Sequence, residues 1–386
     1  MLSRRALLAS SLASTLPGVA AARQLPPPPV ARPQPLASDL PWVPRPTDAL
    51  VGPAIGIGGL DQAKTYPTLK AALDAAPRDG SRYTIAIGDM ALREKVLIDR
   101  PNTIVYGLAG GGRIAWDDYS GRTDPANPAT TLGTRRTATV TITAPDVAIY
   151  DLTILNDFDY PTQIGLPEGD PKKVRDTQAL ALAISGQADR IILQNVHLDG
   201  WQDTLFIDTG RTYIGNSRIS GSVDFIFGAG TVALEYCEIV SRLMPGKPGQ
   251  GFVCAPSTLK ETPYGFVFFN CRLTHEGEPF PDNSTALARP WRPTTSFPDG
   301  RYGNPDVQSA CLYLHCTFDD HIAGKGFDHM SYNAKGGTKA FNEPQDARFY
   351  IWECKGKAVA DIPANFTAPD ALVAGLTPEK LLGFKA

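Results

Sequence analysis

Two aspartates, Asp203 and Asp224, lie 21 residues apart in two stretches of the chain that repeat each other. Residues 190–206 read RIILQNVHLDGWQDTLF and residues 211–227 read RTYIGNSRISGSVDFIF, so Arg, Asn, Gly, Asp and Phe recur at one offset. A fixed period of this kind indicates a solenoid, in which each unit stacks on the next. Equivalent positions on neighbouring strands lie about 5 Å apart. We therefore expect the two carboxylates to lie one above the other on one face.

A stacked pair of carboxyl groups has a definite chemistry. Two ionised carboxylates at this separation repel by roughly 3 kcal/mol at an effective dielectric near 20, which equals about two pKa units. One of them is therefore expected to be protonated near neutral pH. A neutral carboxyl beside an ionised one supplies an acid paired with a nucleophile or a base. The alternative is two solvated turn aspartates, which is less favoured because apolar strand residues follow both Asp203 and Asp224.

The elements that must position this pair are short β-strands separated by turns. From Thr84 onward the sequence consists of β-rich runs broken by Gly, Asn and Asp, which is typical of such strands. The clearest runs are 84–87, 103–106, 140–143 and 149–154. Residues 66–77 have apolar residues at helical spacing and a proline stop, so they predict a short helix that caps one end of the stack. A second short helix is expected over 378–382.

Two long segments, 245–263 and 274–305, interrupt the repeat. We interpret them as loops that project from the stack, and loops on a rigid scaffold commonly shape binding sites.

The cysteines follow the same repeat. Four of the six end a similar strand motif, at the position that Val196 and Ser217 hold in the two copies above; they are Cys237, Cys271, Cys316 and Cys354. Small buried side chains stacked in the core are the favoured interpretation. Oxidation of a neighbouring pair such as Cys237 and Cys271 stays open, because sequence does not establish connectivity. No His or Cys spacing is typical of zinc, so we expect no metal site.

The bulk composition and the N-terminus bear on partners and location. The 386 residues carry a net charge of −3 without a Lys/Arg block, so nucleic acid is not an expected partner. Arg4 and Arg5 precede an apolar run and small residues, which predicts a cleavable signal peptide over 1–22. Residues 3–8, SRRALL, also resemble a twin-arginine signal. The apolar run is too short to span a membrane, and no lipid anchor is indicated.

A proline-rich leader is predicted over 23–48, ahead of a β-helix domain over 49–386. The mature protein is expected to be periplasmic or secreted. Nothing in the sequence requires an oligomer, so a monomer is expected.

Several motifs resemble those of one enzyme family. GWQDTL at 200–205, GSVDFIFG at 221–228 and LARPW at 287–291 resemble the three signature motifs of pectin methylesterases, also called pectinesterases. NDFDYP at 156–161, DTQ at 176–178, APST at 255–258 and DHM at 328–330 also resemble that family and point to its bacterial branch. The resemblance runs in order from about Tyr66 to the C-terminus.

This resemblance implies a single-stranded right-handed parallel β-helix that hydrolyses the C6 methyl ester of galacturonate units in pectin or its oligomers. No cofactor is implied. Asp224 would be the nucleophile, and Asp203 would donate a proton to methanol and later accept one from water. Gln202 and Gln178 would donate amide N–H groups to the oxyanion. Arg289 would keep Asp224 ionised and oriented.

The resemblance also implies substrate contacts, and the sequence departs from the family in places. The implied contacts are Trp291, Thr134, Met330, Val223, Phe227 and Trp201. Trp201 stands where the family usually has Tyr, and Ala288 where it usually has Gly. Ser217 stands where a cysteine often pairs with the equivalent of Cys237, so that disulfide is expected to be missing.

Other functions fit less well. A serine esterase is disfavoured because no G-x-S-x-G motif is present. A glycosidase could use two carboxylates, but it would leave both glutamines and Arg289 without a role. A calcium-dependent pectate lyase should show a tight acidic cluster, which the sequence lacks. A carbohydrate-binding solenoid or inactive relative would have lost part of the polar constellation.

Overall fold

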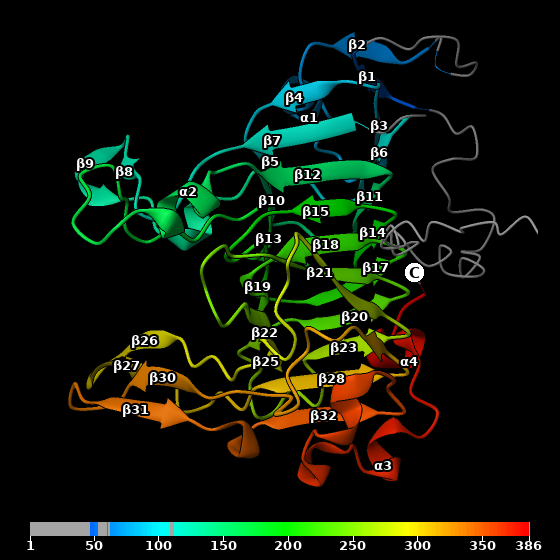
Figure 1. Ribbon diagram of the computed structural model, residues 1–386. Coiled ribbons are helices and arrows are strands. Elements are labelled where there is room, and N and C mark those ends of the chain that lie inside the picture. Colours follow the sequence, from blue (N-terminus) through cyan, green and yellow to red (C-terminus); the bar gives the residue numbers. More distant parts are fainter. Residues whose placement is uncertain (1–46, 53–59, 61, 109–111, 386) are drawn as a thin grey trace, which may run out of the picture. The chain divides into compact units, whose positions relative to one another are not determined.

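The chain winds into successive coils, and from β3 (Tyr83–Ile87) to β25 (Thr285–Ala288) each coil contributes one strand to each of three parallel sheets. The computed structural model describes residues 47–52, 60, 62–108 and 112–385, and all of them belong to one unit that runs from Gln34 to Ala386. Figure 1 shows the strands of successive coils stacked one upon another. The predicted signal peptide and nearly all of the predicted leader lie outside the described residues, so the signal peptide, the leader and export stay predictions.

Sheet 1 has the longest row of strands. It contains β1 (Ala49–Val51), β2 (Lys64–Tyr66), β3 (Tyr83–Ile87), β6 (Thr103–Gly107), β11 (Val147–Tyr150), β14 (Ile191–Gln194), β17 (Arg211–Gly215), β20 (Thr231–Glu235), β23 (Phe266–Phe269), β28 (Ala310–Leu314) and β32 (Arg348–Trp352). Sheet 2 contains β4 (Ala91–Arg93), β7 (Gly112–Trp116), β12 (Leu152–Asn156), β15 (His197–Asp199), β18 (Arg218–Gly221), β21 (Glu238–Arg242), β24 (Arg272–Glu276) and β29 (Thr317–Phe318).

Sheet 3 carries the two aspartates of interest. It contains β5 (Val96–Ile98), β10 (Val140–Ile142), β13 (Leu182–Ile184), β16 (Leu205–Ile207), β19 (Val223–Gly228), β22 (Gly251–Pro256) and β25 (Thr285–Ala288).

Three antiparallel hairpins stand apart from the sheets: β8 (Thr123–Asp124) with β9 (Asn127–Thr131), β26 (Thr294–Phe297) with β27 (Gly300–Gly303), and β30 (Met330–Asn333) with β31 (Lys339–Asn342). In Figure 1 all three hairpins extend to the same side of the stack. The predicted all-β parallel β-helix is confirmed.

The 21-residue period seen in the sequence equals the offset between paired residues on neighbouring strands of the sheets. Ile191 pairs with Thr212, His197 with Arg218, and Leu205 with Ile226, each at an offset of 21. Between sheets 1 and 2 the chain turns at residues with positive φ, Asn195 (53°) and Asn216 (47°) in these two coils. Asparagine tolerates this left-handed conformation because its short side chain can hydrogen-bond locally. The recurrent Asn of the repeat is therefore a turn residue.

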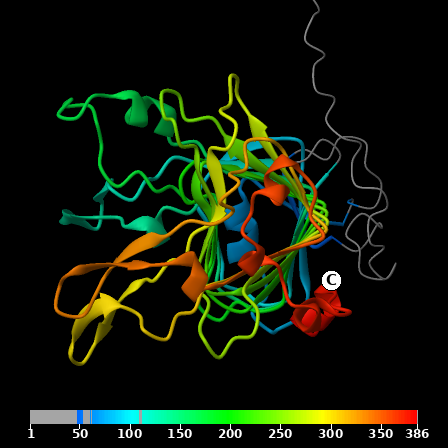
Figure 2. The same cartoon turned by 60° about the horizontal axis from the view of Figure 1, so that its bottom comes forward.

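Short helices cover the two ends and one side of the unit. The predicted first helix is α1 (Leu69–Asp74), which begins where the Thr68 hydroxyl accepts a hydrogen bond from Ala71 N. Figure 2 shows α1, in blue, lying across the interior that the sheets enclose, and its apolar face joins the main core. The predicted second helix is α4 (Pro378–Leu382), and α2 (Tyr160–Gly165) and α3 (Asp370–Val373) complete the set. Within the described residues no helix has the length and apolar content to cross a bilayer.

The interior confirms the expected column of small side chains. Cys237, Cys271 and Cys316 are buried and Cys354 is partly buried, and all six cysteines are free thiols. The main apolar core runs from α1 through every coil of the stack.

Two sequence interpretations were wrong. Residues 149–154 are not one strand, because Asp151 takes a positive φ of 53° and separates β11 from β12. The segments 245–263 and 274–305 are not loops throughout. The first contains β22 of sheet 3. The second begins with the last residues of β24 and contains β25 of sheet 3. Glycine, proline and alanine at these positions hide the alternation by which a strand is usually recognised.

Candidate active site

Asp203 and Asp224 occupy equivalent positions of neighbouring coils, as the repeat predicts. Gln202 pairs with Val223 and Leu205 with Ile226, so the residues on both sides of the aspartates are aligned. Asp203 N donates a hydrogen bond to Val223 O at 3.0 Å, which ties the two positions together through the backbone. Both aspartates have positive φ, 65° and 50°. Such strained backbone is held by surrounding structure and concentrates at functional sites.

A groove of about 1040 Å³ opens above this part of sheet 3. All five polar residues of the predicted constellation line it, namely Asp203, Asp224, Gln178, Gln202 and Arg289. Its walls include residues that follow β9 and residues of the β26–β27 and β30–β31 hairpins, which is the side to which these elements extend in Figure 1. The structure therefore brings together residues that are more than a hundred positions apart in the sequence.

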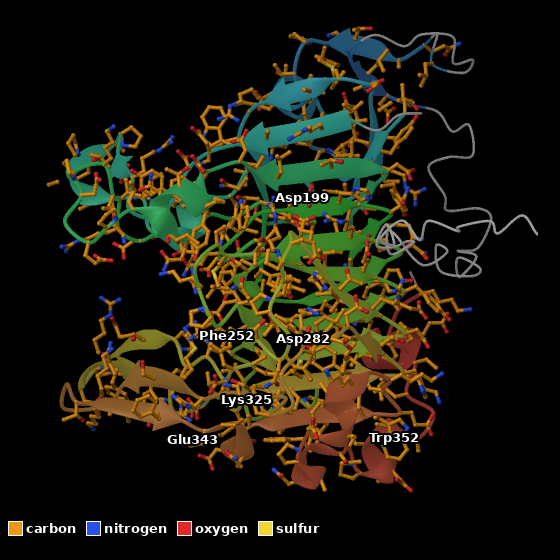
Figure 3. All side chains as sticks on the ribbon, in the orientation of Figure 1. Asp199, Phe252, Asp282, Lys325, Glu343 and Trp352 are labelled. Carbon is orange, nitrogen blue, oxygen red and sulfur yellow. The ribbon has the colours of Figure 1, made fainter. Side chains whose placement is uncertain are left out.

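Arg289 forms a fork on Asp224. Its Nε lies 2.8 Å from Oδ1 and its Nη2 lies 2.5 Å from Oδ2. Phe252 of β22, labelled in Figure 3, has its ring 3.9 Å from the guanidinium carbon and so restrains the arginine from the side. Two parallel charge-assisted hydrogen bonds fix the orientation of the carboxylate and stabilise its negative charge.

Asp203 is the member of the pair whose pKa is raised. Its exposed fraction is only 9%. Burial raises the pKa of Asp203 well above its ordinary value, and the negative charge of Asp224 adds to this effect. The positive charge of Arg289 lowers the pKa, but its effect is the smallest of the three. A raised pKa favours the protonated form of a carboxyl group, which can donate its proton.

Gln202 directly precedes Asp203, and Gln178 lies one coil earlier, where Ala179 N donates a hydrogen bond to Gln202 O at 3.1 Å. Gln202 Oε1 accepts a hydrogen bond from Thr177 Oγ1 at 2.9 Å, which leaves the amide N–H groups of Gln202 to face the groove. Gln178 Oε1 is buried and has no hydrogen-bond partner in the described part of the chain. Sequence reasoning missed Thr177, although it lies inside the DTQ motif beside Gln178.

The predicted substrate contacts divide into two groups. Thr134, Met330, Phe227 and Trp291 line the groove. Trp291 meets the ring of Phe227 edge to face, at 5.6 Å between centroids. Val223 and Trp201 are not among the groove-lining residues and instead pack in a neighbouring cluster with Tyr160. In that cluster the ring of Trp201 stacks on Tyr160 at 6.0 Å and lies 3.9 Å from the guanidinium carbon of Arg242.

Other groove residues were not foreseen. Phe206 stacks on Phe227 at 4.7 Å, and the 21-residue repeat that relates the two could have identified it. Arg135 lies over the ring of Phe206 and pairs with Asp208 at 3.3 Å. Burial raises the pKa of Asp208 and Arg135 partly opposes that effect. No periodicity links Arg135 to this wall, so the sequence held no signal for it.

The fold and the groove define a parallel β-helix protein whose site is built on a stacked pair of aspartates. A family model described as Pectinesterase matches residues 57–338. Pectinesterase A of Dickeya chrysanthemi is 36% identical over 323 residues, which cover 83% of this chain and 87% of that protein.

Solved structures agree with this match. A pectin methylesterase from Erwinia chrysanthemi superposes with a TM-score of 0.81 at 34% identity, covering 88% of this chain and 98% of that one. One from Yersinia enterocolitica gives 0.79 at 36% identity, covering 83% and 100%. The chain therefore belongs to the pectinesterase family, and its relatives place it in the bacterial branch. The predicted family and enzyme class are confirmed: the protein is a pectinesterase, a carboxylic ester hydrolase.

Proposed function

We propose that the protein removes methyl esters from galacturonate units of pectin by an attack of Asp224, with Asp203 as acid and then base. The observation that carries this proposal is the asymmetry of the pair. Asp224 holds the forked hydrogen bonds of Arg289, whereas Asp203, one coil away, is buried with a raised pKa. A nucleophile and a proton donor thus stand side by side in one groove.

In the first half of the reaction an oxygen of Asp224 attacks the carbonyl carbon of the C6 ester. Negative charge develops on the carbonyl oxygen, and the amide N–H groups of Gln202 and Gln178 are the donors that meet it. Donors set in place before the reaction stabilise such an oxyanion without reorganisation. Thr177 contributes by holding the Oε1 side of Gln202, which sets the direction of its N–H groups.

Collapse of the tetrahedral intermediate breaks the bond to the methoxy group, and Asp203 gives its proton to the departing methanol. The product at this stage is an anhydride between Asp224 and the galacturonate carboxyl. In the second half a water molecule attacks this anhydride and Asp203 takes its proton. Pectate and the free Asp224 carboxylate are released, and both aspartates return to their starting states.

The groove suits a polymer or an oligomer of sugar units. Trp291 and Phe227 offer apolar ring surfaces beside the aspartates. A related pectin methylesterase, 34% identical to this chain, has been solved in complex with a hexasaccharide. We infer that successive galacturonate units lie along the groove, with one methyl ester above Asp203 and Asp224.

The experiment supplies highly methylated pectin and follows methanol, reducing ends and unsaturated products together. We expect methanol alone; new reducing ends would indicate a glycosidase, and unsaturated products a lyase.

Asp224→Asn should abolish methanol release and leave the circular dichroism spectrum unchanged. Asp146→Asn is the matched control, because Asp146 also accepts two hydrogen bonds from one arginine, Arg190, but at a half-exposed site just before β11 and away from the groove. Near-normal turnover by Asp224→Asn would contradict the assigned nucleophile.

A further inference from the structure

Four cysteines outside the groove occupy one position in four successive coils. Each directly follows a turn residue of positive φ, so each enters the core at the same point of its coil; these turn residues are Tyr236, Asn270, His315 and Glu353. We call Cys237, Cys271, Cys316 and Cys354 the cysteine column.

Strand register places neighbours of the column directly opposite each other. Glu235 pairs with Phe269 and Glu238 with Arg272, both at an offset of 34, which aligns Cys237 with Cys271. Cys271 and Cys316 are aligned in the same way by pairs at an offset of 45. Leu314 pairs with Trp352 and Thr317 with Lys355, both at an offset of 38, which aligns Cys316 with Cys354.

The four thiols also point in the same direction. Each Sγ lies 3.3–3.4 Å from a backbone carbonyl oxygen of the preceding coil; the four acceptors are Ile214, Leu234, Phe268 and Tyr313. Each acceptor stands three residues before the column position of its own coil. Every thiol therefore reaches toward the coil that contains its N-terminal neighbour, and Cys354 reaches toward Cys316.

The spacing suits a disulfide. In-register residues of adjacent strands have Cα atoms about 4.8 Å apart, and disulfides span Cα separations of about 4.4–6.8 Å. Neighbours in the column can therefore be bridged without separating the coils.

Access differs sharply along the column. Cys237, Cys271 and Cys316 are at most 2% exposed, whereas Cys354, at the C-terminal end, is only partly buried. The hydrogen bond with Cys316 lowers the pKa of Cys354, which favours its reactive thiolate. An oxidant in solution therefore meets the column at Cys354.

We propose that Cys316 and Cys354 form a disulfide when the protein meets a low-molecular-weight disulfide. The Cys354 thiolate attacks one sulfur of that oxidant, forms a mixed disulfide and releases the first small thiol. Cys316 then loses its proton and attacks the Cys354 sulfur, which releases the second small thiol. Two protein thiols are oxidised and one external disulfide is reduced.

Pairing at the end of the column has a further consequence. A bond between Cys316 and Cys354 leaves Cys237 and Cys271 as two neighbouring free thiols. A bond between Cys271 and Cys316 would instead leave the thiols at the two ends of the column, each without a free thiol beside it. The new bond also closes the segment 316–354, which carries the β30–β31 hairpin and the groove residue Met330. Closing a long segment stabilises the fold chiefly by restricting the unfolded chain.

The test uses the full-length protein incubated with oxidised glutathione, then denatured and treated with a thiol-alkylating reagent. We expect the six free thiols to fall to four and peptide mapping to find residues 316 and 354 linked. The oxidised protein should melt at a higher temperature and return to the original value with dithiothreitol. The methylesterase rate should change little, because no cysteine of the column lines the groove.

Two variants separate this bond from other oxidation. Cys354→Ser should keep all its remaining thiols and show no rise in melting temperature. Cys254→Ser is the control, because Cys254 and Cys311 form the other close pair, with 3.4 Å between their sulfurs, and both are buried. It should still form the link between 316 and 354. Six thiols remaining in the oxidised wild-type protein, a stable glutathione adduct at Cys354, or a link between 254 and 311 in place of 316 and 354 would overturn the proposal.

Discussion

Replacing Arg289 by methionine should remove the cation on which the asymmetry of the aspartate pair depends. The guanidinium is about one-fifth exposed and the Asp224 side chain one-tenth exposed, so water screens the pair only weakly. Methionine keeps an apolar stem against Phe252 but supplies no hydrogen bond to Asp224. After the substitution two carboxyl groups share one buried site without a compensating charge.

The size of the effect follows from the geometry. Unit charges about 4 Å apart interact by about 4 kcal/mol at an effective dielectric of 20. This corresponds to a loss of about 10³ in rate if all of it is felt in the transition state. The pKa of Asp203 should rise further, since Arg289 is the group that now lowers it.

The assay measures methanol release from methylated pectin across the pH range and separates kcat from KM. Arg289→Lys should recover part of the rate, because it restores the charge without the fork. Arg190→Met is the control, because Arg190 makes the same fork on Asp146, at 2.7 and 2.6 Å, at the partly exposed positions just before β14 and β11. It should stay within about twofold of wild type, as exposed ion pairs contribute little. An Arg289→Met enzyme that lost less than tenfold in rate would refute this reasoning.

Three further outcomes are expected. Gln202→Leu should lower kcat by about 10²–10³ with little change in KM, measured by steady-state kinetics, because one oxyanion donor is lost. Asp203→Asn should be inactive yet melt at a higher temperature than wild type in mild alkali and at the same temperature in strong acid. The raised pKa of Asp203 means that its ionisation opposes folding as the pH rises. Asp189→Asn should lose about 1–2 kcal/mol of stability at neutral pH in urea titrations and nothing near pH 2. Hydrogen bonds from Arg211 lower the pKa of Asp189 to about 2, so this stability is present above the ordinary pKa and is lost as the pH falls toward 2.

The sequence predicts the fold well where the turn residues and the strand pairing recur at the same interval along the chain. Asn195 and Asn216 adopt the same left-handed turn, and the offset of 21 between them is the offset that stacks Asp203 on Asp224. Because each coil must bury the same face as its neighbour, a match at this period determines which side chains share a face. The stacking of the two aspartates could therefore be predicted from the sequence alone.

The same reasoning fails where coil length varies. In sheet 3 the offset between paired strands is 21 from Leu205 to Ile226, but 28 from Ile226 to Cys254 and 34 from Cys254 to Ala288. The connections between sheets absorb these differences, so no period leads from Asp224 to Arg289, and only the family resemblance joined them. For the same reason β22 and β25 were taken for loops. Trp201 lies in the cluster with Tyr160, and the sequence held no signal for that placement.

The order of the coils explains why two chemically equal carboxyl groups differ. Arg289 follows β25, and β25 reaches the aspartates through β22 and then β19, so it approaches from the C-terminal side of the pair. Asp224 belongs to the nearer coil and Asp203 to the farther one, about 4.8 Å beyond. The fork of Arg289 can span one carboxylate, and it engages Asp224. Burial then raises the pKa of Asp203 with only partial opposition from the cation. The direction in which the solenoid is wound thereby decides which aspartate holds the guanidinium and which has the raised pKa.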